Sequence, residues 1–205
     1  MLVDYDGDRT VAQLELIKNE DPDIIMLQEV HGRRKSYVDS ALVGYRTFPE
    51  FRIQDTAMGC LIYCRNNLHV HDIVSRNFAS SFMERGFSAV CVGNTWYMTT
   101  HLESMDKPQF EALRQRQLAE MWEFIANKNH VVIGMDSNIK GDIKCPAGVS
   151  DVWKNEPTHT WFANRFFGYD ASARFDRFIV KNICVADKNV IENKFSDHDM
   201  LSISI

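Results

Sequence analysis

The apolar residues of this chain recur at helical spacing in three stretches. Val11, Leu14 and Ile17 lie three residues apart, so they share one face of a helix that Thr10 can cap. The longest apolar face belongs to the third helix and comprises Phe110, Leu113, Leu118, Met121, Trp122 and Ile125. The pattern predicts helices over 10–20, 33–43 and about 107–127.

Shorter apolar runs, bounded by turn residues, predict strands. The run 24–27 follows an Asp-Pro-Asp turn and is apolar at consecutive positions, which is typical of a strand covered on both faces. Tight connections at 66–67 and 93–94 favour antiparallel pairing in the middle of the chain. Strands are expected over 24–27, 45–48, 57–64, 68–75, 87–93, 95–100, 130–135, 174–180, 183–187 and 199–205. The stretch 140–172 is expected to be loop-rich. This order of elements predicts an α/β fold, a sandwich of two packed sheets flanked by helices.

The composition is typical of a globular protein with a full core. The chain has 205 residues, 45% of them apolar, and no linker-like stretch, so one domain over 1–205 is expected. The net charge of −5 argues against a basic protein that coats nucleic acid nonspecifically, although it allows a nucleic-acid enzyme. The five cysteines form no CxxC pair, which favours small buried residues in a reducing compartment over a zinc site. With no signal peptide and no membrane-length apolar run, we expect an intracellular monomer of the nucleus or cytoplasm that does not bind membranes.

Four short polar clusters follow apolar runs, at 28–29, 101–104, 136–138 and 196–198. They are rich in carboxylate, imidazole and amide groups, and together they indicate one site at the edge of a sheet. Carboxylates without thiolate partners suit a hard cation such as Mg²⁺. Histidine and asparagine suit a phosphate that gathers negative charge during reaction. The clusters therefore predict a metal-dependent phosphoesterase, although each alone could be a strand end or a turn.

The side chains of these clusters can be assigned roles in phosphate-ester hydrolysis. Glu29 ends a buried strand and is a candidate metal ligand. His101 can donate a hydrogen bond to a phosphate oxygen, and Ser104 can contact the neighbouring phosphate, with Glu103 as a supporting residue. Asp136 is the candidate base that orients and deprotonates water, while Asn138 holds the phosphate or that water.

A second group of side chains surrounds the C-terminal histidine. Asp176 can buttress His198, fix its tautomer and favour its protonated form. Protonated His198 can then stabilise charge on the phosphorus, and Asp197 can reach the metal directly or through water. The catalytic candidates are Asp136, Asn138, His198, His101 and Asp176, and the candidate metal ligands are Glu29 and Asp197.

The segments LQEV, HLES, the D-S-N cluster, RFDRF and SDH occur in this order and resemble the endonuclease/exonuclease/phosphatase superfamily. Within it the chain is most similar to the 5′-specific tyrosyl-DNA phosphodiesterases, in which HLES, a DVW-like segment, Thr-Trp and RFDR occur together. These motifs extend here from Glu29 to His198, with the tryptophan at Trp161 and an arginine of that family at Arg85. The resemblance implies a two-sheet α/β sandwich with one Mg²⁺ or Mn²⁺ site.

The resemblance also implies substrate contacts. Arg85 and Trp161 would line the groove beside the departing tyrosine, where a cation over an indole face is worth about 0.5–2 kcal/mol. Lys140, where the family has an arginine, supplies charge without a bidentate fork, and with Ser104 it completes the substrate-binding set. The family's asparagine, on a core strand before the first helix, has no counterpart, so that first core strand is expected to be missing here.

The leading functional hypothesis is a metal-dependent phosphodiesterase that hydrolyses the 5′-phosphotyrosyl bond between protein and DNA, or RNA, by in-line attack of water. The first alternative is another superfamily activity, such as an abasic-site endonuclease, a nuclease or an inositol or lipid phosphatase. The second is a noncatalytic scaffold that binds nucleic acid or protein. Unpaired buried carboxylates are costly without a metal, which weighs against a scaffold.

Overall fold

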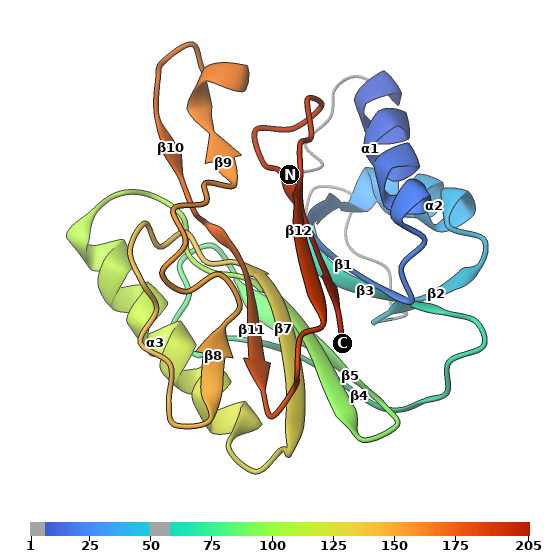
Figure 1. The fold of residues 1–205 in the computed structure, drawn as a ribbon. Coiled ribbons are helices and arrows are strands. Elements are labelled where there is room, and N and C mark those ends of the chain that lie inside the picture. Colours follow the sequence, from blue (N-terminus) through green and yellow to red (C-terminus); the bar gives the residue numbers. More distant parts are fainter. Residues whose placement is uncertain (1–6, 50–57) are drawn as a thin grey trace.

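A six-stranded sheet forms the centre of the computed structural model, which describes residues 7–49 and 58–205. Its strand order is β4-β5-β6-β7-β11-β8. The strands are β4 (Val70–Asn77), β5 (Gly86–Val92), β6 (Thr95–His101), β7 (His130–Asp136), β11 (Asp176–Lys181) and β8 (Val149–Asp151). Only β6 and β7 pair in parallel, because α3 (Pro108–Ile125) provides the crossover between them. Leu118, Met121 and Ile125 of α3 are buried against one face of this sheet (Figure 1).

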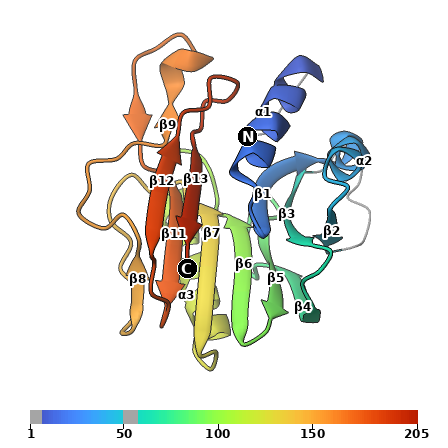
Figure 2. The ribbon, with the colours of Figure 1, turned by 45° about the vertical axis from the view of Figure 1, so that its right-hand side comes forward.

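A smaller sheet packs on the opposite face, with strand order β1-β3-β2. These strands are β1 (Ile24–His31), β3 (Met58–Arg65) and β2 (Tyr45–Phe48). Its outer face is covered by α1 (Gly7–Glu20) and α2 (Gly32–Ala41) through a core that includes Leu14, Val38 and Leu61 (Figures 1 and 2). Ile62 of β3 and Val90 of β5 are buried between the two sheets. The predicted two-sheet α/β sandwich flanked by helices is therefore confirmed.

A hairpin of β12 (Asp187–Ile191) and β13 (Met200–Ser204) lies beside this smaller sheet without joining it. Among the described strands β1 pairs only with β3 and β13 pairs only with β12, so one edge of each faces the other. A groove of about 490 Å³ lies between them, lined by 24–28 and 200–205. The expected absence of a first core strand concerns residues ahead of α1 that lie outside the described part of the chain, and it stays a prediction.

The central sheet and β1 approach one another closely at Gly134. A Cβ atom there would lie 2.7 Å from the sulfur of Met26 and 3.2 Å from a ring carbon of Phe178. A side chain at this position would force Met26 to shift, so the glycine lets β1 cross directly over β7. This close approach brings the residues that follow Met26 towards the end of β7.

Two elements differ from the sequence-based prediction. The strand expected over 183–187 is wrong, because the strand in this region is β12 at Asp187–Ile191. Its position is set by pairing with β13 rather than by local apolar alternation. The expected loop-rich stretch contains β8, the short pair β9 (Trp161–Phe162) and β10 (Ser172–Ala173), and a 3₁₀ turn. Strands of two or three residues carry too little periodicity to be recognised in a sequence. In the described part of the chain, no helix is both long and apolar enough to cross a membrane.

Asp39 of α2 fastens that helix to the smaller sheet. Its carboxylate accepts hydrogen bonds from Lys35 Nζ at 2.7 Å, Thr47 Oγ1 at 2.7 Å and the Tyr63 hydroxyl at 2.9 Å. Burial raises the pKa of Asp39, but these hydrogen bonds together outweigh it and leave the pKa below its ordinary value of 3.8. The ionised form is therefore the one that stabilises the fold.

Asp39→Ala is expected to lower the free energy of unfolding by about 1–3 kcal/mol, because the buried Tyr63 hydroxyl loses its partner. A lowered pKa in the folded state gives stability above the ordinary pKa that is lost as pH falls through the folded pKa. Urea denaturation should thus show a difference at pH 7 that shrinks below pH 3.8. Ser40→Ala, an exposed neighbour, is the control, and an equal loss in both variants would contradict the role of Asp39.

Candidate active site

Three adjacent strand ends of the central sheet bring polar residues together. His101 ends β6 and Asp136 ends the parallel strand β7, where the two are partners in register. Asp176 begins β11 and is the antiparallel partner of Asp136. His101 and Asp136 are buried, and Asp176 is partly buried. Three of the predicted catalytic residues are thus side by side because of sheet register.

The smaller sheet brings Glu29 to this edge. The pairing of β1 with β3 is irregular between Leu27 and Val30, and Glu29 has a φ of 55°. A left-handed backbone costs a residue other than glycine about 1–3 kcal/mol and re-aims its side chain. The Glu29 carboxylate lies 3.5 Å from His101 Nδ1 and 3.8 Å from a guanidinium nitrogen of Arg85.

His101 is held between a cation and an amide. Arg85 NH1 lies 3.1 Å from its Nδ1, and Asn138 Nδ2 lies 2.8 Å from its Nε2. Burial lowers the pKa of His101 well below its ordinary value, and the charges of Arg85 and His198 lower it further. The ring is therefore neutral, and with Arg85 donating to Nδ1 we assign its hydrogen to Nε2. That hydrogen is available to Asp136, whose Oδ2 is 3.4 Å away, or to a substrate oxygen, and it can reach Asn138 only when the amide turns its oxygen to the ring, because the amide nitrogen is itself a donor.

Asp136, His198 and Asp176 form the second half of the cluster. His198 Nδ1 lies 2.8 Å from Asp176 Oδ2, which is the contact the sequence analysis expected. Burial lowers the pKa of His198, but the charge and hydrogen bond of Asp176 outweigh it and raise the pKa to about 9. Burial raises the pKa of Asp136 to about 6, against the opposing charge of His198, whose Nε2 is 3.9 Å from Oδ2. At neutral pH the cluster therefore pairs an ionised Asp136 with a cationic His198.

Asp197 links this cluster to the segment that carries Trp161. The Trp161 indole donates to Asp197 Oδ2 at 3.0 Å, and the backbone of Trp161 pairs with that of His198. The Trp161 ring lies 5.2 Å from that of Phe175. The short pair β9–β10 thus places an aromatic wall beside the predicted metal ligand.

Two buried carboxylate oxygens are available to bind a cation. Glu29 Oε2 and Asp197 Oδ1 are buried and make no hydrogen bond within the described part of the chain. Buried acceptors without partners are costly, and oxygen donors of this kind suit Mg²⁺. Ligand atoms of Asp136, Asp176 and His198 also lie within 4.8 Å of one another, and His198 Nδ1 already pairs with Asp176 Oδ2 at 2.8 Å.

Two predicted substrate contacts remain outside this cluster. Lys140 Nζ is exposed and pairs with Asp106 at 2.5 Å, and Ser104 Oγ lies 3.1 Å from the sulfur of Met83. Their roles towards a substrate stay predictions.

Arg85 makes no cation–π contact with Trp161 among the described residues, and the role of both side chains beside a departing tyrosine stays a prediction. Arg85 turns to His101 and Glu29 instead. The negative charge of Glu29 attracts the guanidinium more strongly than an indole face does.

Two buried residues hold the segments around the site in place. Glu103 is fully buried and accepts hydrogen bonds from the backbone of Phe82 at 2.7 Å and Met83 at 2.6 Å, and also from Ser81 and Gln117. It thereby anchors the segment that leads to Arg85. The place of Glu103 beside His101 predicted a supporting role but not the segment that Glu103 supports.

Arg177 holds the loop after β7 and is almost fully buried. It donates to Ser137 Oγ at 3.1 Å, the Ile139 carbonyl at 2.9 Å and the Gly141 carbonyl at 2.5 Å, and it pairs with buried Asp151 at 2.7 Å. In the sequence Arg177 alternates with apolar residues, which is the pattern of a strand residue that faces solvent. The sequence therefore did not predict that Arg177 holds this loop.

Arg177→Ala is expected to lower the free energy of unfolding by about 3–5 kcal/mol, because the buried Asp151 carboxylate loses its nearer cation. The cation that remains, Arg174, is 3.5 Å away. Chemical denaturation measures this loss of stability, with the exposed Arg116→Ala of α3 as control. A loss below about 1 kcal/mol would mean that Asp151 finds another partner.

A protein-family model describes this chain. The model of the Endonuclease/Exonuclease/phosphatase family matches residues 6–198. A 5′-tyrosyl-DNA phosphodiesterase of Caenorhabditis elegans is 27% identical over 188 residues, which are 82% of this chain and 51% of that protein. The chain thus spans about half the length of this curated relative.

Solved structures share the fold. D. rerio TDP2 complexed with a single-strand DNA product is 22% identical, covers 96% of this chain and 91% of its own, and superposes with a TM-score of 0.84. A mannosyl-6-phosphatase of Bacteroides thetaiotaomicron is 16% identical, with 97% and 90% covered and a TM-score of 0.77. With most of its length matched by the family model, the chain belongs to the endonuclease/exonuclease/phosphatase family of phosphoester hydrolases.

Proposed function

We propose that this protein is a metal-dependent phosphodiesterase that hydrolyses the 5′-phosphotyrosyl bond joining a protein to DNA. One observation carries the proposal: at a single sheet edge, an ionised Asp136 lies between a neutral His101 and a cationic His198. A base, a neutral donor and a fixed cation are what attack of water on a phosphodiester requires.

The residues divide the reaction between them. Asp136 takes a proton from the attacking water, which it orients together with Asn138. His198, kept protonated by Asp176, stabilises negative charge as it gathers on the phosphoryl oxygens. Neutral His101 donates from Nε2 to another of these oxygens, with Arg85 and Glu29 holding its far side.

Glu29 and Asp197 are the residues that would hold Mg²⁺, or Mn²⁺, through the two oxygens that lack other partners. When bound, such an ion neutralises phosphate charge as a Lewis acid. The tyrosine phenolate, with a pKa near 10, leaves more readily than a sugar alkoxide, so little protonation of the leaving group is needed.

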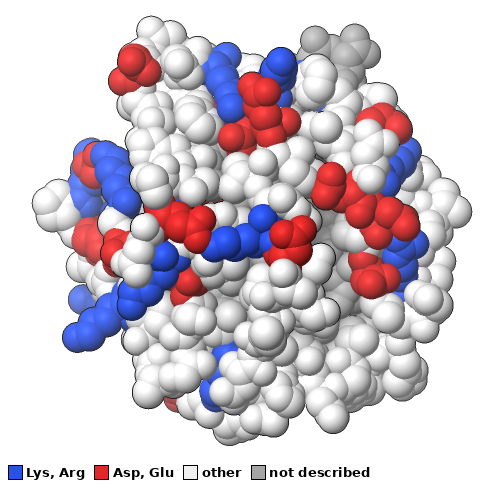
Figure 3. Space-filling view, in the orientation of Figure 1, with Lys and Arg blue, Asp and Glu red and all other residues white. Residues whose placement is uncertain are grey.

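The proposed substrate class rests on the relatives and on the distribution of charge on the surface. The C. elegans relative is named for 5′-tyrosyl-DNA, and the D. rerio structure contains single-strand DNA. Acidic and basic side chains alternate across the face in Figure 3, and no continuous basic patch covers the described chain there. This surface fits recognition of one DNA end at the site better than nonspecific coating of a duplex.

The test is hydrolysis of a 5′-phosphotyrosyl oligonucleotide with Mg²⁺ or with EDTA, beside an abasic duplex and a phosphoinositide. We expect Mg²⁺-dependent release of the 5′-phosphate oligonucleotide, with the other two substrates untouched. Cleavage of the duplex or the phosphoinositide instead would retain the family chemistry and reject the phosphotyrosyl substrate. No turnover by a folded protein that binds Mg²⁺ would favour a noncatalytic scaffold.

A further inference from the structure

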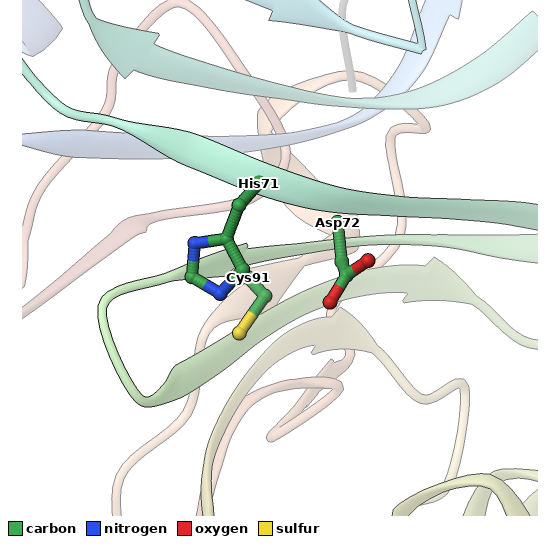
Figure 4. Close-up of side chains that lie close together, drawn as sticks. All are labelled: His71, Asp72 and Cys91. Carbon is green, nitrogen blue, oxygen red and sulfur yellow. The ribbon is translucent and has the colours of Figure 1, made fainter.

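A second group of metal-ligating side chains lies at the opposite end of the central sheet. It consists of His71 and Asp72 on β4 and Cys91 on β5, whose ligand atoms all lie within 4.8 Å of one another (Figure 4). Cys91 pairs with Trp96 on β6, five residues before His101. At the rise of an extended strand that is about 16 Å from the catalytic cluster, so this group is separate from it.

A β-bulge creates the arrangement. Val70 pairs with Val92 and Asp72 with Cys91, so His71 is one extra residue on β4. Consecutive residues of a regular strand point to opposite faces, but a bulge re-aims one of them. In Figure 4 the side chains of His71, Asp72 and Cys91 all extend towards the same side of the strands.

The two β4 side chains are free to bind a ligand. Neither the His71 imidazole nor the Asp72 carboxylate makes a hydrogen bond or ion pair within the described part of the chain, and both are exposed. His71 stacks on His69, with ring centroids 6.1 Å apart. The Cys91 thiol is nearly buried and makes one weak contact, 3.7 Å to the Gly93 carbonyl. The exposed carboxylate of Asp72, the exposed imidazole of His71 and the buried thiol of Cys91 therefore lie close together, and no hydrogen bond or ion pair joins them to one another.

The donor set selects the metal. Sulfur, nitrogen and oxygen together suit Zn²⁺, whereas Mg²⁺ prefers oxygen ligands alone. Tetrahedral ligands of Zn²⁺ lie about 3.5 Å apart, given metal–ligand distances of about 2.0–2.3 Å. Side chains already within 4.8 Å need to move by only about an ångström to reach that geometry.

We propose that His71, Asp72 and Cys91 bind a Zn²⁺ ion, with water as the fourth ligand. Binding forms a zinc–thiolate bond, and the thiol proton passes to solvent. Because β4 is the edge strand of the sheet, the ion clips this edge to β5 and stabilises the pair against opening.

The nearby Lys128 partly offsets the burial and the Asp72 charge that raise the pKa of the Cys91 thiol. Its ammonium interacts electrostatically with both Cys91 and Asp72. It sits over the rings of Trp96 and Phe124, at 4.6 and 4.1 Å from their centroids. Lys128 thus supplies positive charge that offsets the two anionic ligands.

The test is titration of the EDTA-treated 205-residue chain with Co²⁺, a spectroscopic substitute for Zn²⁺, in excess Mg²⁺ to keep oxygen-only sites filled. We expect a thiolate-to-cobalt charge-transfer band that Zn²⁺ displaces. Cys91→Ser should lose the band because it removes the thiolate. His71→Ala removes a direct ligand, so it should weaken binding at least as much as loss of a group that only supports a ligand, which is about 10–100-fold.

Matched controls keep the result specific. Cys184→Ser removes an exposed free cysteine elsewhere, and His130→Ala removes a histidine outside the group. Both should retain the band and the affinity. Circular dichroism in EDTA confirms that each variant folds, and His71→Ala, at an exposed position, serves if Cys91→Ser does not fold. The absence of a band in the parent protein overturns the proposal, as does a band that survives both substitutions.

Discussion

Replacing Asp136 by asparagine is expected to lower kcat by about 10²–10⁴-fold, because the variant cannot accept the proton of the attacking water. The asparagine oxygen can still accept the hydrogen bond from the Asn138 backbone, which is 3.0 Å long in the parent protein. Folding and binding of the oligonucleotide should therefore remain. Single-turnover hydrolysis of the 5′-phosphotyrosyl oligonucleotide and a binding titration measure the two effects separately.

The stability of Asp136→Asn provides an independent check. Burial raises the pKa of Asp136 from its ordinary value of 3.8 to about 6. The parent protein therefore loses stability as the pH rises from 3.8 through about 6. The neutral variant avoids that loss, and its melting temperature at pH 7–8 should equal or exceed that of the parent. Asp187→Asn, an exposed carboxylate on β12, is the control. An Asp136→Asn protein that fails to fold would refute the catalytic assignment.

Replacing His198 by glutamine is expected to lower kcat by about 10²–10³-fold, comparable to the loss of one fixed donor at a developing oxyanion. Glutamine can still donate a hydrogen bond from a similar position, but it carries no charge. Folding should persist because His198 is held mainly by Asp176 at the site edge. His159→Gln, an exposed histidine elsewhere, is the matched control. Full activity of His198→Gln would exclude the cationic role.

The pH dependence of kcat/KM tests whether the charge of His198, and not only its position, matters for activity. Activity needs ionised Asp136 and protonated His198, so kcat/KM should rise through about pH 6 and fall through about pH 9. Asp176→Asn removes the charge that raises the pKa of His198, so the alkaline limb should move to lower pH. An alkaline limb that stays in place would show that Asp176 has only a structural role.

The site residues that the sequence predicted best are those whose evidence lies in adjacent residues. The polar clusters at the ends of 130–135 and 95–100 were recognisable because each follows a buried apolar run. Parallel register then brings His101 opposite Asp136. The Asp176–His198 pair was predictable from residue type, since a carboxylate and an imidazole near the sheet edge attract one another.

Other features depended on contacts between distant segments. Arg85 was expected over Trp161, but Glu29, carried on a different sheet, draws it away. Arg177 looks like a solvent-facing residue in its own strand, and only the loop folded over it explains its burial. The zinc-ligand group at His71 depends on one unpaired residue in β4, which no local pattern announces.

By itself the sequence determined the α/β class, most helices and strands, and the residue types that favour phosphoester hydrolysis. Apolar periodicity and carboxylate, histidine and amide chemistry are local properties, so they can be read along the chain. Only the tertiary structure decided which of these side chains meet, which are charged, and what supports them. Sheet register, burial and the field of neighbouring charges set these, and each arises from residues far apart in the sequence.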